Sequence, residues 1–267
     1  MTTTTWPRVA VAAAVFGLLT ACGGGGGSSN TSTGGNTGGS TPTNASPGGI
    51  WRGTDTISGL QVIGLVDEAG EFHFMRSDEV QYVGTASVSG TSVTSSFDGY
   101  APLGTSFTDG STHGTGSVSG TVTARTSLSL NSQFKTDSGS SSSGTLDLTF
   151  DTLYNRASAL ATIAGNFTNP QTNVVVTVNS DGSVFSQDPT TGCVLNGTVS
   201  IINASYNAYR ITFAYASCTG AGAVLNGVQF TGLGTLDNTV TPERAILGVT
   251  GTSSGTTYAL VFQLNRS

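Results

Sequence analysis

Residues 118–124 read Val-Ser-Gly-Thr-Val-Thr-Ala. Small apolar residues occupy every second position of this stretch, and Ser or Thr occupies the positions between them. Successive side chains of an extended chain point to opposite faces of a sheet, so this period of two is typical of a β-strand. The stretch therefore predicts β-structure with one small apolar face and one hydroxyl-bearing face.

The same alternation recurs along the rest of the chain, at residues 82–88, 146–150 and 211–215. Turn signals such as Asp109-Gly110 and Ser180-Asp181-Gly182 separate the alternating stretches. After the first 49 residues, no segment has the apolar spacing of an amphipathic helix. The chain is therefore predicted to be all-β and antiparallel.

Two related halves are indicated by matches that keep the same order along the chain. The matching stretches are 49–51 with 165–167, 82–85 with 195–198, 116–118 with 234–236, and 148–150 with 260–262. We expect two tandem up-and-down β-barrel repeats of about eight strands each, at residues 50–157 and 158–267, because closure removes exposed strand edges. One larger sheet system is the alternative.

The ends of the two halves carry an aromatic and a basic residue in matching places. Gly49-Ile50-Trp51 opens the first half and Arg156 closes it, while Phe167 and Arg266 hold the same places in the second half. This arrangement resembles lipocalins and other calycins, in which a basic residue near the last strand packs on a Trp of the first strand. The resemblance implies a Trp51–Arg156 contact and a Phe167–Arg266 contact.

The N-terminal segment ends in Leu19-Thr20-Ala21-Cys22. It resembles the lipobox of bacterial lipoproteins, in which the cysteine is lipidated and becomes the mature N-terminus. The apolar run before it spans about 11 residues, whereas a membrane-spanning helix needs about 20. Residues 1–21 are therefore predicted to be a signal peptide; an ordinary signal-peptidase site before Cys22 is the alternative.

Gly23 follows the cysteine in place of the aspartate that retains many lipoproteins in the inner membrane, so the resemblance implies the outer membrane. Residues 22–49 are rich in Gly, Ser, Thr and Asn and predict a disordered tether. A poly-Gly run after a lipobox also loosely resembles surface lipoproteins of Gram-negative bacteria. Surface and periplasmic exposure are both compatible with the sequence.

The charge balance argues against a nucleic-acid partner. The full chain has 9 basic and 15 acidic residues, and Arg8 is the only charged residue of the signal segment. The mature chain would then carry a net charge of −7. Nucleic-acid binding needs basic surface that displaces counterions, so we expect no nucleic-acid partner.

Cys193 and Cys218 remain once Cys22 is assigned to lipid. The strands between them are expected to form a hairpin that turns near residue 205, which would place the two cysteines opposite each other at its open end. In an exported protein such a pair predicts a disulfide. A two-cysteine metal site is the less favoured alternative because no His or acidic ligand lies nearby.

No residue pattern argues for catalysis, a cofactor or a metal. Residues 251–255 match Gly-x-Ser-x-Gly, but this stretch lacks the strand–turn–helix context and the later His that the motif requires. His73 alternates with Phe72 and Phe74 and is expected to face solvent. With Gly, Ala and Val facing inward, the barrels are expected to hold little cavity.

We therefore expect a non-catalytic binding or interaction module that is anchored in the membrane through Cys22. Tyr100, Leu103 and Phe107 lie in a predicted loop and are candidates for partner contact, or else they plug the barrel end. The alternative functions are a carrier of a small apolar ligand and a structural envelope lipoprotein. The expected partner is thus a protein or a small apolar molecule.

Overall fold

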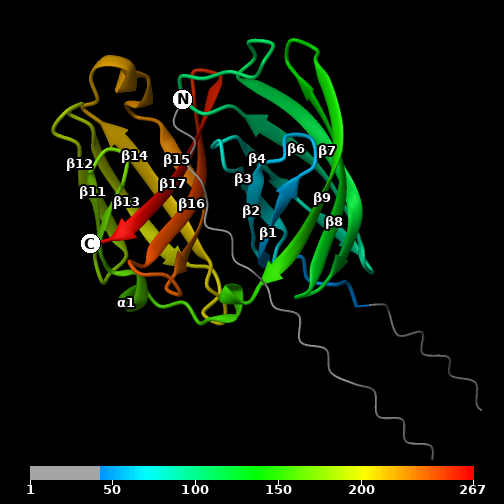
Figure 1. Ribbon diagram of the computed structural model, residues 1–267. Helices are drawn as coiled ribbons and strands as arrows, with labels where there is room; N and C mark the ends of the chain where they lie inside the picture. The colour runs from blue at the N-terminus through cyan, green and yellow to red at the C-terminus, as the bar shows by residue number, and fades with distance from the viewer. Residues whose placement is uncertain (1–42) are drawn as a thin grey trace, which may run out of the picture. The chain divides into compact units, whose positions relative to one another are not determined.

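A computed structural model describes residues 43–267 of the chain (Figure 1). The predicted signal peptide (1–21), the lipidation site Cys22 and all but the last residues of the predicted tether (22–49) lie outside the described residues.

The described chain is built from two closed antiparallel β-barrels of eight strands each. The first barrel contains β1 (Gly49–Asp55), β2 (Gln61–Val66), β3 (Glu71–Arg76), β4 (Gln81–Thr85), β6 (Ser92–Tyr100), β7 (His113–Thr123), β8 (Ser127–Thr136) and β9 (Ser141–Asp151). The second barrel contains β10 (Gly165–Thr168), β11 (Val175–Val178), β12 (Ser183–Gln187), β13 (Val194–Ile201), β14 (Tyr209–Ala216), β15 (Gln229–Asp237), β16 (Arg244–Ser253) and β17 (Thr256–Arg266). The prediction of two tandem up-and-down barrels is confirmed.

Each barrel closes by pairing strands that are distant in sequence. In the first barrel β1 pairs with β9, where Trp51 lies opposite Phe150, and β4 pairs with β6. The short strand β5 (Ser87–Ser89) follows β4 and pairs only with β6. In the second barrel β10 pairs with β17, where Phe167 lies opposite Arg266.

The sequence matches between the two halves fall on equivalent strands. They lie on the first (β1, β10), fourth (β4, β13), sixth (β7, β15) and eighth (β9, β17) strands of the two barrels. The two barrels are thus structural repeats with the same strand order. Loop lengths differ, and the first barrel carries β5 as an addition.

The helical segments of the described chain are short: η1 (Thr152–Asn155), α1 (Leu160–Ile163) and η2 (Gly220–Leu225). η1 and α1 lie in the connection between the barrels, and η2 lies between β14 and β15. Within residues 43–267, no helix has the length and apolar character needed to cross a bilayer.

The barrels pack on each other through the outer faces of β2–β4 and β15–β17. This packing explains why β2 is buried on both faces from Val62 to Val66. It also makes the expectation for His73 wrong. His73 does face away from Phe72 and Phe74, but the second barrel covers that side, and the residue is only 4% exposed.

A polar contact lies inside this apolar interface. Gln81 of β4 is fully buried, and its Nε2 lies 3.3 Å from the Val249 carbonyl oxygen and 3.4 Å from that of Leu260. Its Oε1 lies 2.6 Å from Nδ1 of His73. Because the amide is satisfied on both sides, it can be buried without the cost of an unpaired polar group.

Cys193 and Cys218 are disulfide-bonded, as predicted. The register differs from the expected one by one residue: Val194 pairs with Ala216, which would set Cys193 opposite Ser217. Ser217 adopts a left-handed φ of 60°. Cys218 is then held by Asn226, whose Oδ1 accepts from the Cys218 N–H at 2.8 Å and whose Nδ2 donates to the Cys218 carbonyl at 3.0 Å.

The disulfide should stabilise the second barrel by restricting the unfolded chain. The two cysteines are 25 residues apart, a loop for which the lost chain entropy corresponds to about 3.5 kcal/mol. Replacing both cysteines (Cys193→Ala and Cys218→Ala) should lower the free energy of unfolding by about that amount in urea denaturation. Reduction of the unaltered protein is the control and should give a similar loss; an unchanged denaturation midpoint in both would contradict this account.

An ion pair joins the barrels at the edge of the interface. Nη1 of Arg210 in β14 lies 2.5 Å from Oε1 of Glu71 in β3, and Nε2 of His73 lies 3.7 Å from the same oxygen. His73 and Arg210 outweigh burial and lower the pKa of Glu71 to about 2. The ionised carboxylate is therefore favoured in the folded protein.

Acid should weaken the fold partly through this group. Since the pKa of Glu71 is depressed on folding, its stabilising contribution is present above its ordinary pKa of 4.5 and is lost as the pH falls toward about 2. Urea denaturation between pH 6 and pH 2 should show a shallower loss of stability for Glu71→Gln than for the unaltered protein. Identical pH dependence of the two proteins would be inconsistent with this role.

Candidate functional site

The first barrel contains a cavity of about 610 Å³. It lies toward the barrel end formed by the turns after β1, β3, β6 and β8, called here the cavity end. Apolar and aromatic side chains form most of its wall, among them Val62, Phe72, Phe74, Phe97, Phe134 and Leu146. The opposite end is closed by Trp51, which is fully buried and packs edge-to-face on Phe150 at 5.5 Å.

The expectation that inward Gly, Ala and Val leave little cavity is wrong for the first barrel. The diameter of a closed barrel follows from strand number and shear, so small inward side chains leave its interior unfilled. Inward glycines also let aromatic rings lie flat on the wall: a Cβ on Gly64 would collide with Phe74, and one on Gly116 with Phe97. The rings thus line the cavity instead of crossing it.

The second barrel, by contrast, is filled. Its interior space measures only about 60 Å³ and is lined entirely by apolar side chains. Tyr209, Phe213 and Phe230 are buried in its core, and Phe213 stacks on Phe230 with ring centroids 5.2 Å apart. The two repeats therefore share a strand order but differ in what they can enclose.

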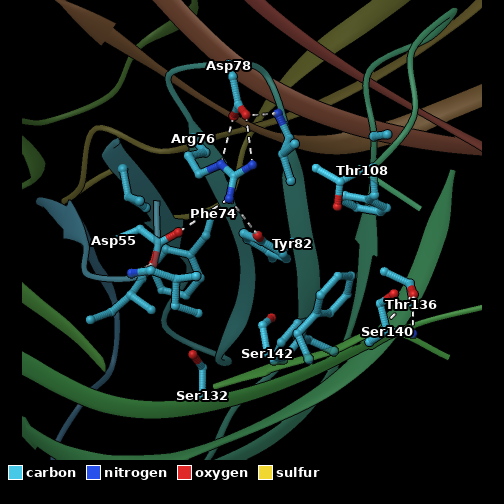
Figure 2. Close-up of a pocket in the computed structure, with 18 of the residues that line it drawn as sticks. Asp55, Phe74, Arg76, Asp78, Tyr82, Thr108, Ser132, Thr136, Ser140 and Ser142 are labelled. Carbon is cyan, nitrogen blue, oxygen red and sulfur yellow. Dashed lines mark hydrogen bonds and ion pairs between the residues drawn. The ribbon is translucent and has the colours of Figure 1, made fainter. Parts of the chain in front are cut away.

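A charged cluster lies in the wall of the cavity (Figure 2). Arg76 follows Phe74 by two residues, so it faces inward from the end of β3. Its Nε and Nη2 donate to the two carboxylate oxygens of Asp78, at 2.8 and 2.7 Å. Its Nη1 lies 3.3 Å from Oδ2 of Asp55 and 3.4 Å from the hydroxyl of Tyr82.

The protonation states of the cluster follow from its contacts. Burial alone would lower the pKa of Arg76, but the hydrogen bonds to Asp78 and the charges of Asp78 and Asp55 raise it above its ordinary value. Burial raises the pKa of Tyr82, which is therefore a neutral phenol at physiological pH. With two carboxylates around one guanidinium, the cluster has a formal charge of −1.

Serine and threonine side chains approach the cavity from the other side. Ser132 of β8, Ser142 of β9 and Thr108 of the loop after β6 lie around it in Figure 2. These hydroxyl groups can both donate and accept hydrogen bonds. The cavity thus combines an aromatic wall with neutral hydroxyls and one internally paired charge cluster.

The loop at residues 101–112 covers part of the cavity. The ring of Phe107 packs on Phe134, with centroids 5.4 Å apart. Ser111 Oγ lies 2.7 Å from Ser138 Oγ, and Thr136 donates to the carboxylate of Asp109, so the loop is tied to the β8–β9 turn. These hydrogen bonds hold Phe107 against the wall of the cavity.

Of the residues predicted either to contact a partner or to plug the barrel end, one is exposed and two are largely covered. Leu103, at the tip of the 101–112 loop, is 43% exposed and free for contact. Phe107 is half-buried in the cavity wall, as a plug of the barrel end would be. Tyr100 ends β6, is 8% exposed and packs on His113 with ring centroids 5.0 Å apart.

The two predicted aromatic–basic pairs have different outcomes. The Arg266 guanidinium lies over the ring of Phe167 at 4.7 Å, as the calycin resemblance implies. Arg156 is exposed and donates to Asn238, so it is not on Trp51. Arg125, from the β7–β8 turn, takes a related role at that barrel end and lies over Phe150, Tyr154 and Tyr206, the last at 4.4 Å.

Sequence reasoning missed the residues of the charged cluster. Asp78 lies in the turn between β3 and β4, where an acidic residue needs no functional explanation. The signal that could have revealed the cluster is Arg76, a charged residue in register with two inward phenylalanines. A charged side chain that faces the interior of a barrel requires partners of opposite charge. The carboxylates that pair with Arg76 lie in the wall of the cavity.

The residues considered for catalysis do not form a reactive site. Residues 251–255 form the end of β16 and its turn into β17, a hairpin as expected. Within residues 43–267, no three His, Cys, Asp or Glu side chains gather so that they could hold a metal ion. The cavity is therefore the feature of this part of the chain on which a function can be built.

Comparisons with known proteins add no assignment. No protein-family model matches the chain, and no curated protein is similar to it in sequence.

Proposed function

We propose that this protein is a lipid-anchored outer-membrane lipoprotein that acts by binding a small apolar molecule in its first barrel. The observation that carries the proposal is the cavity of about 610 Å³. Small-molecule sites typically measure about 300–1,000 Å³ and combine a mainly apolar wall with a few polar groups. The cavity of the first barrel has both properties.

The second barrel would serve as a rigid support. Its interior is filled, and its outer face covers β2–β4 of the first barrel. Gln81 and the Glu71–Arg210 ion pair link the two barrels on the outer side of strands that line the cavity. A binding site held in this way needs little reorganisation when a ligand enters.

The membrane anchor of the proposal rests on the lipobox-like segment. Acylation at Cys22 would attach the chain to the outer membrane. Residues 44–46 hydrogen-bond to the first barrel, so a tether of about 20 residues would remain, and it would span roughly 22–27 Å. The binding barrel could then reach molecules near the membrane surface without being embedded in it. A ligand that partitions into membranes would be available at that place.

The anchor is tested by fractionation of cells that produce the full chain. The unaltered protein should take up labelled fatty acid and appear in the outer-membrane fraction. Lipidation of the lipoprotein type adds more than one acyl chain, which is what stable anchoring requires. Cys22→Ala should abolish labelling and leave the membrane fraction, whereas Cys193→Ala is the matched control and should still be labelled. Labelled Cys22→Ala would exclude lipidation at this residue.

Ligand binding is tested by filling the cavity. Ser132 faces the cavity and its neighbour Asn131 points outward on the same strand. Binding of a neutral fluorophore, N-phenyl-1-naphthylamine, should be weakened at least tenfold by Ser132→Phe and left unchanged by Asn131→Phe. Thermal unfolding of both variants checks the fold; equal binding by the two folded variants would rule out the cavity as the site.

A protein partner is the second candidate function. Ile57 and Leu103 are 49% and 43% exposed, and both lie on loops at the cavity end of the first barrel. Exposed apolar side chains on loops that a rigid scaffold positions are suited to partner contact. The two functions are compatible, since a partner at this end would lie over the entrance of the cavity.

A further inference from the structure

We propose that the cavity selects uncharged apolar molecules that carry a hydroxyl or carbonyl oxygen, and that it discriminates against carboxylates of the fatty-acid type. The inference rests on the proposed function and names the class of ligand. It is carried by the way in which the charged groups of the cavity pair with one another.

Arg76 is not available to a ligand carboxylate. Among the residues that line the cavity, Arg76 is the one basic side chain, and its partners Asp55 and Asp78 are the acidic ones. The guanidinium is already held by both oxygens of Asp78 and by one oxygen of Asp55. A ligand carboxylate would therefore find no free bidentate partner, and it would enter beside a cluster of net negative charge.

The two carboxylates of the cluster already accept hydrogen bonds from the protein. The oxygens of Asp55 accept from the Ile57 N–H at 2.9 Å and from the Ser58 hydroxyl at 2.7 Å in addition to Arg76. Both oxygens of Asp78 accept from Arg76, and its Oδ1 also lies 3.4 Å from the Val80 N–H. A ligand ammonium would lose its water in an aromatic cavity and could only share carboxylate oxygens that already accept hydrogen bonds from the protein. The cost of removing its water therefore disfavours an ammonium relative to an uncharged oxygen.

Neutral hydroxyl groups of the cavity can still bond to a ligand. The Tyr82 hydroxyl accepts from Arg76, which leaves its own proton available to an acceptor in the cavity. Ser142 and Thr108 face the cavity with neutral hydroxyls (Figure 2). An alcohol or carbonyl oxygen can bond to such groups without bringing a charge into the cavity.

The positions of these groups also orient the ligand. Asp55, Arg76, Asp78 and Tyr82 come from strand ends and a turn at the cavity end, whereas Phe72 and Leu130 lie further along the barrel. An elongated molecule would therefore place its apolar body deeper in the barrel and its oxygen near the entrance.

The test compares three molecules with the same chain and different head groups. Purified protein loaded with N-phenyl-1-naphthylamine is titrated at pH 7.5 with 1-dodecanol, dodecanoate and dodecylamine, each below its aggregation concentration. Dodecanol should displace the probe at a concentration at least tenfold lower than dodecanoate or dodecylamine. Raising the salt concentration should narrow the difference between dodecanol and dodecanoate, because repulsion by the cluster is screened.

A pair of variants separates the cluster from overall charge. Asp78→Asn removes one carboxylate from Arg76 and should improve dodecanoate binding about tenfold while dodecanol binding changes little. Asp147→Asn is the matched control: it removes the same charge from an exposed position on the outer face of β9 and should alter neither. If Asp78→Asn does not fold, Asp55→Asn, which removes the other carboxylate beside Arg76, takes its place and should have the same effect.

The outcomes distinguish the inference from the function on which it rests. Dodecanoate or dodecylamine that binds as tightly as dodecanol would overturn the inference and leave a carrier of apolar molecules in place. Failure of the probe and of all three molecules to bind would overturn the proposed function and the inference with it.

Discussion

Closure of each barrel by backbone hydrogen bonds is the constraint on which the rest of the structure depends. Once β1 pairs with β9 and β4 pairs with β6, the ring has no free edge, and its diameter is set by strand number and shear and not by the side chains inside. The interior can then be filled or left hollow without a change of fold. This independence of backbone and contents allows one repeat to become a support and the other to enclose a cavity.

The two barrels use this freedom in opposite ways. Large apolar residues fill the second barrel, whereas glycines in the first let Phe74 and Phe97 lie against the wall. A cavity lowers stability because the packing contacts of its lining are lost, so the surrounding structure must compensate. Contacts with the second barrel can compensate for this loss. They comprise the apolar interface, the hydrogen bonds of Gln81 and the Glu71–Arg210 ion pair.

At each end of the first barrel, an arginine is paired with carboxylates. Near the cavity, Arg76 is enclosed by Asp55 and Asp78. At the Trp51 end, Arg125 bonds to Glu68 at 2.7 Å and lies over Tyr206 of the second barrel, so that one side chain links both repeats. The basic residue expected in that region is Arg156, the counterpart of Arg266 in sequence order; it lies beyond the end of β9, directly after η1, whereas Arg266 lies in β17. Arg125 of the β7–β8 turn packs on these aromatic rings instead, and its position in the sequence does not predict this contact.

The sequence by itself determined the strand content, the twofold repeat and the disulfide, because these depend on local alternation, on internal similarity and on the pairing of two cysteines across one hairpin. Even there the strand register differs from the expected one by one residue, and the left-handed Ser217 lies between the paired strand and Cys218. Only the tertiary structure decided what each barrel encloses and which outer faces are covered. His73 and Arg76 show the reason: whether an outward residue meets water or another barrel, and whether an inward charge finds partners, depends on strands that are distant along the chain.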